Sequence, residues 1–416
     1  MIKKCMVAGC VAMLATLICM TASSSWAQKK GLIKIGFIVP VTGAFAQNGR
    51  DMVNALEQYL EEIGYQAAGR KIEVVIEDDE GIPATSLMKG RKLVEKDGVH
   101  VLAGVMLTPS GYALAPYVDS KQIPAVLNSG GDDLTQRQRA KWVIRTGITS
   151  SQPMHPFGEY TFKVLKYKKV VALVPDFSFG WECLGGFQRT FEENGGKIIQ
   201  KLWVPAIVQD FSPYISLISK EADAVYGIFA GRMIVQFFSQ FRDYGFKQKV
   251  AVIGIGTSTD ESTLPSMGDE IEGVVTALHY SAALNNAANR KFVKGFREKA
   301  KKPPGWYAET SYTGARWIVE GIKAIQGDVE NSGKFMQALR KIELKDLPRG
   351  PMRIDDYGNP VQNVYIRKVE KVRGELQNTV VHTYNNVSQF WNYKAEEYLK
   401  QPPYTRDYVP PSPKAQ

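Results

Sequence analysis

From Ile33 onward, short runs of β-branched and apolar residues alternate with stretches of helical periodicity. Apolar side chains recur at helical spacing over Arg50–Ile63, and Gly64 predicts the end of that helix. Strands separated by helices indicate βαβ units, in which helices cover both faces of a parallel sheet. The strands predicted in this first series are Ile33–Val39, Val74–Asp78, Val99–Gly104, Pro124–Leu127 and Trp142–Arg145.

A second series of the same kind follows. Two α/β series of similar length indicate two lobes, and 416 residues suffice for two or three folding units of about 100–200 residues each. The strands predicted here are Val170–Val174, Ile198–Val204, Ala224–Ile228, Val250–Gly254 and Ile271–Leu278. The predicted helices are Gly185–Asn194, Tyr214–Lys220, Met233–Tyr244, Arg290–Ala300 and Tyr312–Ile325.

The chain after Leu347 follows a different pattern. Gly350–Gly358 predicts a short strand and a tight turn built on Asp and Gly, and Val361–Val369 predicts the strand that follows it. Residues 401–416 are rich in proline, so this end of the chain is expected to be a loose tail.

Residues 1–27 predict export. Two lysines precede an apolar run from Cys5 to Met20, and Ser25-Trp26-Ala27 forms a small-x-small site, so a signal peptide cleaved before Gln28 is expected. The apolar run is too short for a comfortable membrane span. The alternative is lipidation, because Val7-Ala8-Gly9-Cys10 resembles a lipoprotein box, although little apolar sequence precedes it.

Charge and cysteine content limit the possible partners. The formal net charge is +10, or +8 without the two lysines of the leader, and no run of five or six basic residues predicts a nucleic-acid arm. The surplus is either an ordinary solvated surface or a weak field that attracts anions. Of the four cysteines, only Cys183 lies outside the leader, so stability is expected from core packing rather than from a disulfide.

In an open parallel sheet, ligands bind beyond the carboxyl ends of the strands. After the third strand, Thr108 is expected to cap a helix with Pro109 at its first position, and the free helix amides suit a carboxylate. In the neighbouring loop, Ser129–Gly131 can bend so that successive amides face one anion, while Asp132 and Asp133 are expected to cap the next helix. Helix capping alone also explains Thr108, but two such loops on adjacent strands are more specific than one.

Three further loops are candidates for the same edge. Asp176–Trp181 and Gly305–Glu309 place aromatic residues beside glycine, which predicts an apolar wall for a flat ligand; packing between helices is the alternative. Pro40–Gly49, after the first strand, is either a ligand loop or a plain connection.

Motifs of reaction machinery are absent from the sequence. There is no G-x-S-x-G elbow, phosphate-binding loop, H-E-x-x-H or C-x-x-C, and Gly254-Ile255-Gly256 lacks the third glycine of a dinucleotide fingerprint. The four histidines are far apart and lack metal-ligand spacing. We therefore expect a binding protein without cofactor or metal; the alternative is a secreted hydrolase that uses Cys183 or Ser178.

The order and spacing of several motifs resemble the periplasmic substrate-binding proteins of ABC transporters, specifically the branched-chain amino acid (Leu/Ile/Val-binding) family. The resemblance covers nearly the whole mature chain. The motifs that carry it are Ile35-Gly36-Phe37, Thr42-Gly43, Asn48-Gly49, Asp78-Asp79, Ala103-Gly104, Thr108-Pro109-Ser110, Ile123-Pro124, Leu134-Thr135, Arg145-Thr146, Gly180, Gly245 and Gly350-Pro351.

This resemblance implies the type I periplasmic-binding fold, an α/β fold of two Rossmann-like lobes with parallel sheets and a hinge of three crossings. The crossings are expected near Arg145–Ser150, Ala277–Ala282 and Arg349–Asp355. The expected domains are lobe 1 (28–147 plus 278–348) and lobe 2 (148–277 plus 349–400). The resemblance further implies a periplasmic monomer that closes on its ligand and docks on the permease subunits of the transporter, with no nucleic acid as partner.

The resemblance also implies ligand-binding positions. Thr108 with the stretch 128–130 corresponds to the carboxylate grip of the amino-acid binders. Phe179 and Ala230 correspond to tyrosines that reach the ligand from the second lobe, and Gly256 to the acid that pairs with the ligand's ammonium. The full expected set is Asn48, Thr108, Pro109, Asn128, Ser129, Gly130, Phe179, Trp181, Ala230, Gly256 and Tyr307.

The loss of an acid at Gly256 bears on the ligand. A cation enclosed in a dry cleft without a counter-charge is costly, so we expect an aromatic or apolar carboxylate rather than an α-amino acid. The segment 128–135 is similar to that of family members that handle aromatic carboxylates. Two alternatives stay open: Glu309 supplies the missing acid, or the same fold serves as a ligand sensor for a receptor.

Overall fold

The computed structural model describes residues 31–246 and 249–411. The expected signal peptide, its cleavage site and the alternative lipoprotein box lie outside these residues. Both β-sheets belong to one unit that begins at Ile33.

Within the described residues, the first sheet has six strands in the order β2-β3-β1-β4-β5-β6, all parallel except β2 with β3. Ile35 and Phe37 of β1 pack into one core and Ile38 into another on the opposite face. Because both faces are buried, the strand reads as a continuous apolar run. The strands are β1 (Ile33–Val39), β2 (Gln66–Ala67), β3 (Arg70–Asp78), β4 (Val101–Gly104), β5 (Ala125–Leu127) and β6 (Val143–Arg145).

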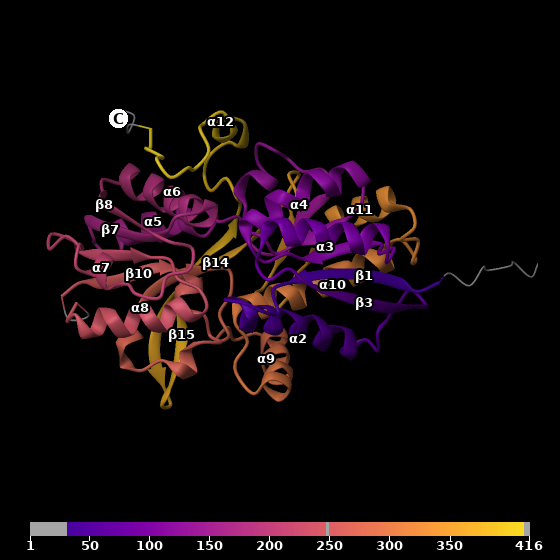
Figure 1. Ribbon diagram of the computed structural model, residues 1–416, viewed down its shortest axis with the longest axis horizontal. Coiled ribbons are helices and arrows are strands. Elements are labelled where there is room, and N and C mark those ends of the chain that lie inside the picture. The colour runs from indigo at the N-terminus through magenta and orange to yellow at the C-terminus, as the bar shows by residue number, and fades with distance from the viewer. Residues whose placement is uncertain (1–30, 247–248, 412–416) are drawn as a thin grey trace, which may run out of the picture. The chain divides into compact units, whose positions relative to one another are not determined.

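Helices cover both faces of this sheet (Figure 1). On one face α2 packs with α9 and α10, and on the other α3 packs with α4. The helices are α2 (Ala46–Glu62), α3 (Pro83–Glu95), α4 (Thr108–Lys121), α9 (Ala287–Ala300), α10 (Trp306–Ala324) and α11 (Ser332–Lys341). No helix in the described ranges combines the length and the apolarity needed to cross a membrane.

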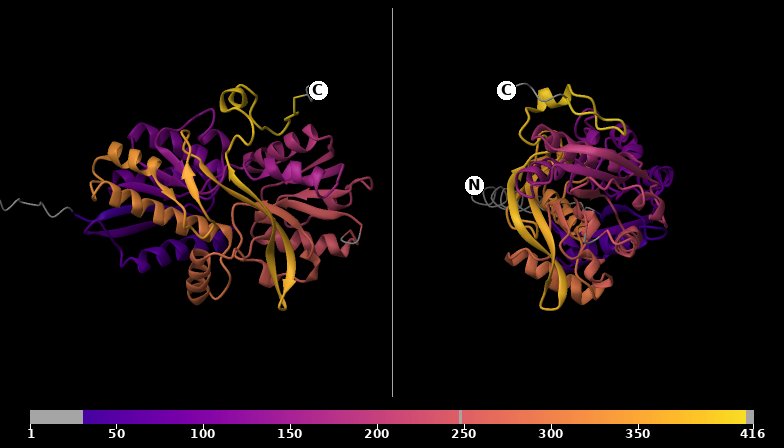
Figure 2. Two further views of the ribbon diagram at one scale, coloured as in Figure 1. Left: turned by 180° about the vertical axis from the view of Figure 1, so that it is seen from behind. Right: turned by 90° about the vertical axis from the view of Figure 1, so that its left-hand side faces the viewer.

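The second sheet has nine strands in the described part of the chain, in the order β12-β13-β14-β11-β10-β9-β7-β8, with β15 paired to β14. Strands β7 to β11 are parallel, and the long hairpin β14–β15 runs along the back of the molecule (Figure 2). The strands are β7 (Lys169–Pro175), β8 (Lys197–Val204), β9 (Ala224–Gly227), β10 (Ala251–Ile255), β11 (Val275–Leu278), β12 (Glu343–Leu344), β13 (Met352–Ile354), β14 (Pro360–Val372) and β15 (Glu375–Val387). The helical elements around it are α5 (Met154–Lys163), α6 (Ser178–Glu193), α7 (Ser212–Ile215), α8 (Arg232–Asp243), η2 (Gly256–Thr259), η3 (Leu264–Ser266) and η4 (Asp269–Ile271).

We call the first sheet with α2–α4 and α9–α11 the first lobe, and the second sheet with α5–α8 the second lobe. In the described residues the chain passes between them three times: from β6 to α5, from β11 to α9, and from α11 to β13. Buried arginines hold these crossings. Arg145 donates to a carbonyl group of the first crossing, Arg349 joins the third crossing to the first, and Arg367 donates to a carbonyl group of the second.

Most predicted strands agree with the structure to within a few residues, but four elements differ. The helix predicted over Tyr214–Lys220 is only the single turn α7, which ends at Ile215. Helix α6 begins at Ser178 rather than at Gly185. The prediction missed its first two turns because glycine has a low helix propensity. Packing requires the glycine at position 180, since a Cβ at Gly180 would overlap the carbonyl oxygen of Pro175. Helix α10 begins at Trp306 rather than at Tyr312. The strand predicted over Ile271–Leu278 begins only at Val275, and the residues around Ile271 form the short helix η4.

The expectation of a loose tail from residue 401 is wrong for the part that the structure describes. Tyr404 and Tyr408 are buried, and they form an aromatic cluster with Phe390 and with Tyr398 of α12 (Ala395–Leu399). The Tyr404 hydroxyl hydrogen-bonds the buried His155 Nε2 at 2.9 Å. Proline keeps this segment extended, but its tyrosines supply the apolar area that holds it to the protein.

Candidate ligand-binding site

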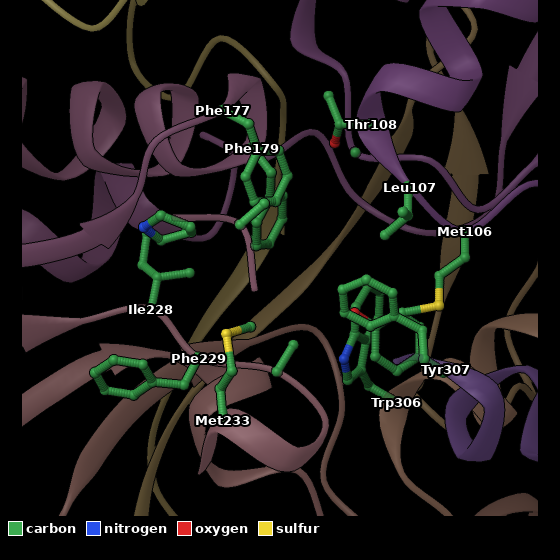
Figure 3. A pocket seen from close by; sticks show the side chains of 15 residues that line it. Met106, Leu107, Thr108, Phe177, Phe179, Ile228, Phe229, Met233, Trp306 and Tyr307 are labelled. Carbon is green, nitrogen blue, oxygen red and sulfur yellow. The ribbon is translucent and has the colours of Figure 1, made fainter. Parts of the chain in front are cut away.

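A pocket lies where the carboxyl ends of both sets of parallel strands face each other (Figure 3). About 510 Å³ of space lies between its protein atoms, a figure that includes open solvent at the mouth. The described residues that line the pocket include no charged side chain. They are Phe45, Met106, Leu107, Thr108, Gly130, Pro175, Phe177, Phe179, Ala206, Ile228, Phe229, Ala230, Met233, Trp306 and Tyr307.

One end of the pocket carries the side chain of Thr108. Thr108 is the first residue of α4, and the N-cap is Leu107, so the predicted cap was one residue too late and Pro109 occupies the second helical position. The Thr108 Oγ1 is buried and has no hydrogen-bond partner among the described residues. Because the hydroxyl does not cap the helix, it is free to bond a ligand.

Gly130 lies beside Thr108, at the meeting point of the two lobes. A Cβ on Gly130 would lie 2.8 Å from Ser150 Oγ, 3.3 Å from Thr108 Oγ1 and 3.4 Å from a ring carbon of Phe179, so only glycine fits without displacement. The carbonyl oxygen of Gly130 accepts from the backbone of Ser150 at 2.8 Å and from Arg145 Nη1 at 3.1 Å. The Arg145 guanidinium therefore occupies the carbonyl side of this loop.

Aromatic side chains form two facing walls (Figure 3). Phe177 and Phe179 stack with ring centroids 6.3 Å apart on the second-lobe side. Trp306 and Tyr307, at the start of α10, pack with centroids 4.0 Å apart on the opposite side. Burial, with a smaller contribution from the charge of Asp260, raises the pKa of Tyr307, so its hydroxyl stays protonated. These walls favour a flat, apolar ligand body.

Five of the expected site residues line this pocket: Thr108, Gly130, Phe179, Ala230 and Tyr307. They come from both lobes; four of them were expected from loops at strand ends, and Ala230 only from the family resemblance. The other six expected residues lie outside the lining: Asn48, Pro109, Asn128, Ser129, Trp181 and Gly256.

Three of these six residues have structural partners. Asn128 Nδ2 donates to Ser311 Oγ at 3.0 Å, which ties the loop after β5 to α10. Ser129 is buried against Gly111 of α4. Trp181 Nε1 donates to Asp176 Oδ1 at 2.9 Å, so its ring is held by the mouth of the pocket rather than inside it.

Asn48 and Gly256 are buried next to the site but behind its lining. Asn48 lies in α2, and its Oδ1 would lie 3.6 Å from a Cβ on Gly231, the neighbour of the lining residue Ala230. A Cβ on Gly256 would overlap the guanidinium of Arg367, which donates to the Gly256 carbonyl oxygen at 2.9 Å. The volume that an acidic side chain would need at this position is therefore occupied by a cation.

Glu309, the alternative acid, is fully buried outside the pocket. Arg349 binds both of its carboxylate oxygens, with Nε at 2.9 Å from Oε1, and His279 Nε2 lies 3.5 Å from Oε2. Burial alone would raise the pKa of Glu309, but the Arg349 charge and the hydrogen bonds lower it to about 2. This carboxylate serves the hinge between the lobes.

The structure does not favour the hydrolase alternative. Cys183 is fully buried, and burial, together with the charges of Asp132 and Glu182, raises the pKa of its thiol well above the ordinary value. A thiol that stays protonated is a poor nucleophile. Across the described ranges, no group of three or more His, Cys, Asp or Glu side chains could hold a metal ion.

Much of the apolar lining was missed by sequence reasoning. Met106, Leu107, Ile228 and Phe229 directly follow strands β4 and β9, so their positions at strand ends were a usable signal. Met233 gave no comparable signal, because it is one of several apolar residues on α8 and only the arrangement of the lobes turns it toward the pocket.

Comparison with known proteins places this arrangement in a family. Residues 32–374 match the family described as periplasmic binding protein. The chain belongs to this family. It is 30% identical over 380 residues to Leu/Ile/Val-binding protein homolog 6 of Brucella melitensis, an alignment that covers 88% of this chain and 94% of the relative.

Solved structures of solute-binding proteins from ABC transporters share the fold of this binding protein. One from Rhodopseudomonas palustris BisB5, in complex with 3,4-dihydroxybenzoic acid, has a TM-score of 0.83 and 33% identity, covering 86% of this chain and 99% of the other. One from R. palustris in complex with benzoate has a TM-score of 0.81 and 27% identity, covering 86% and 98%. A leucine-binding protein from Thermotoga maritima has a TM-score of 0.75 at 23% identity, covering 85% and 99%, and supports the fold alone.

These similarities confirm the predicted fold class and family: the protein is a substrate-binding protein of an ABC transporter with the type I periplasmic-binding fold. The family consists of solute-binding proteins, in agreement with the prediction of a binder rather than an enzyme. Membership of the family also implies a periplasmic location for the binding protein.

Proposed function

We propose that this binding protein captures a small organic acid, an aromatic or apolar carboxylate, between its lobes and delivers it to the permease of an ABC importer. The observation that carries the proposal is the composition of the pocket: aromatic walls, no charged side chain among the described lining residues, and an unpartnered hydroxyl at one end. The solved relatives in complex with benzoate and 3,4-dihydroxybenzoic acid support the same ligand class. Residues 1–27 act in this proposal as the signal peptide that directs export.

The carboxylate is bound at the end of the pocket formed by Thr108 and Gly130. The Thr108 hydroxyl donates to one oxygen, and the positive end of the α4 dipole favours the negative charge. Among the described residues, the amide of the lining residue Gly130 donates to no acceptor, so it is available to the second oxygen. The first lobe thus supplies the polar recognition.

The second lobe closes over the remainder of the ligand. Phe177, Phe179, Ile228 and Met233 bury the apolar body against Trp306 of the first lobe. A ligand stabilises the closed form only by binding it better than the open form, and burial between two walls provides that difference. The size of the apolar space then limits the size of the ligand.

The pocket argues against an α-amino acid. An ammonium group enclosed there would need a counter-charge. Glu309 and Glu261 are already paired with Arg349 and Arg367, respectively. The position that would have carried the acid, Gly256, is filled by the Arg367 guanidinium. Asp260, a further buried carboxylate beside Trp306, already accepts from the backbone of Ser262 and Trp306. Because no carboxylate lines the pocket itself, we expect leucine and valine to bind weakly.

Thermal and chemical unfolding in the presence of a ligand panel tests the ligand class. Benzoate, 3-phenylpropionate, hexanoate and leucine are compared, and a bound acid at 100 times its Kd should raise the free energy of unfolding by about 2.7 kcal/mol. Stabilisation by leucine together with no effect of the three acids would overturn the proposal.

Replacing Thr108 with valine tests the carboxylate end. Thr108→Val keeps the shape but removes the hydroxyl, and the loss of a hydrogen bond to a charged group should weaken binding of the best acid by about 1.5–3 kcal/mol in calorimetry. Thr405→Val, at an exposed position outside the pocket, is the matched control and should leave the affinity unchanged. Equal affinity of Thr108→Val and the wild type would remove this hydroxyl from the site.

A further inference from the structure

The indole nitrogen of Trp306 is a buried donor without an acceptor. The side chain is 3% exposed, and its Nε1 makes no hydrogen bond to any described residue. An indole N–H can only donate, and a buried donor without a partner is unfavourable. Trp306 lines the pocket, and in Figure 3 its nitrogen faces the opposite wall. The missing acceptor is therefore expected inside the pocket.

The position of Trp306 is held from several sides. It is the first residue of α10, its backbone N–H donates to Asp260 Oδ2 at 3.3 Å, and Asp260 Oδ1 in turn accepts from the backbone of Ser262 at 3.0 Å. The indole packs edge-on against His279, with centroids 5.7 Å apart, and against Tyr307. With its backbone and ring both fixed, the donor is preorganised toward the pocket.

The wall that faces this nitrogen offers no oxygen acceptor, and the Tyr307 hydroxyl, on the same side of the pocket as Trp306, makes no hydrogen bond with it. The facing wall consists of apolar side chains such as Ile228, Phe229 and Met233. Thr108 lies at the opposite end of the pocket in Figure 3, where the proposed carboxylate is bound. The two unpartnered polar groups, Thr108 Oγ1 and Trp306 Nε1, thus mark the two ends of one apolar space.

Building on the proposed function, we infer that Trp306 Nε1 selects ligands that carry a hydrogen-bond acceptor at the end remote from the carboxylate. The ligand class is a rod-like aromatic acid with an ether, carbonyl or phenol oxygen at the para position. An acid of the same shape with a hydrocarbon group there leaves the indole N–H unpaired and binds more weakly.

Calorimetry with two acids of nearly equal shape tests this inference. 4-Methoxybenzoate carries an acceptor oxygen where 4-ethylbenzoate carries a methylene, so the wild type should bind the methoxy acid about tenfold more tightly. In Trp306→Phe this ratio should fall to about one, whatever the change in overall affinity. Trp142→Phe, at a tryptophan outside the pocket, is the matched control and should keep the ratio.

The outcomes separate this inference from the proposed function. If neither acid binds, the proposed function fails. If both acids bind the wild type equally, the role of Trp306 is overturned and the proposed function stands. Should Trp306→Phe fail to fold, a crystal structure of the wild type with 4-methoxybenzoate decides the matter. The ether oxygen must then lie within hydrogen-bonding distance of Nε1, and an ether oxygen elsewhere contradicts the inference.

Discussion

Two buried carboxyl groups link the lobes behind the pocket. Glu182 of α6 accepts from the Tyr112 hydroxyl of α4 at 2.6 Å and from the Asp132 backbone at 3.3 Å. Burial, with the charge of Asp132, raises the pKa of Glu182 well above its ordinary value of 4.5, and burial raises the pKa of Asp132 from 3.8 to about 6. The protein interior therefore disfavours the charged form of both groups.

This pair predicts a pH dependence of stability. Between the ordinary and the raised pKa values the folded state binds more protons than the unfolded state, so the contribution of these groups to the free energy of unfolding rises as the pH falls. Glu182→Gln imitates the protonated side chain. It should be more stable than the wild type at about pH 7.5 by denaturant unfolding, with the difference shrinking toward pH 5.

An exposed carboxylate supplies the control for this comparison. Glu298→Gln, on the outer face of α9, should show no such pH-dependent difference from the wild type. A Glu182→Gln protein that is less stable than the wild type at both pH values would contradict the prediction, because it would mean that the charged form makes essential hydrogen bonds.

At the scale of the element, close packing explains the glycines of α6. Gly180, Gly185 and Gly186 lie against the carbonyl of Pro175, the ring of Tyr404 and the backbone of Ser151, respectively, with no room for a Cβ. The helix thereby brings Phe177 and Phe179 to the pocket, so the order of its first turn matters for binding as well as for stability.

Gly180→Ala tests this account of α6. Overlap with a backbone carbonyl should lower the free energy of unfolding by about 1–3 kcal/mol and weaken ligand binding, as measured by denaturant titration and calorimetry. Gly333→Ala in α11 is the control, since the nearest atom lies 3.6 Å from its Cβ; it should be neutral or stabilise by about 0.4–1 kcal/mol. Equal stability of the two variants would refute the packing argument.

At the scale of the whole molecule, the segment Ser388–Pro411, here called the C-terminal strap, joins the lobes. On the first lobe, Arg137 donates to the carbonyl oxygen of Gln401 at 2.8 Å. On the second lobe, Arg406 bonds both carboxylate oxygens of Asp176 at 3.1 Å. Figure 2 shows α12 of the strap over the junction of the lobes. A segment anchored on both sides stabilises this arrangement relative to an opened one.

Removing one anchor of the strap should speed ligand release. Arg137→Gln breaks the bonds to the first lobe and removes the guanidinium that lies over the Tyr398 ring, so the closed form loses stability relative to the open form. We expect a several-fold faster ligand dissociation by stopped flow, on the order of 1 kcal/mol for the lost hydrogen bonds. Arg290→Gln, on the surface of α9, is the control, and equal dissociation rates of the two variants would show that the strap does not act on closure.

Sequence alone was sufficient for the α/β pattern and for placing Thr108 and Gly130 at the edge of the sheet where the pocket lies. The strands are buried on both faces, so each appears as a local apolar run, and Thr108 and Gly130 follow directly from their place at strand ends. The absence of an acid at Gly256 was likewise visible in the sequence, and the structure adds that Arg367 occupies that space.

Only the tertiary structure decided the rest, because it depends on contacts between distant parts of the chain. Glu309 meets Arg349 forty positions away, which makes it a hinge residue rather than a ligand partner. The strap is held in place by the hydrogen bond from Tyr404 to His155, 249 positions earlier. The indole N–H of Trp306 has no acceptor because the wall that faces it carries only apolar side chains. Local patterns encode which elements form, whereas which side chains find partners depends on how those elements meet in space.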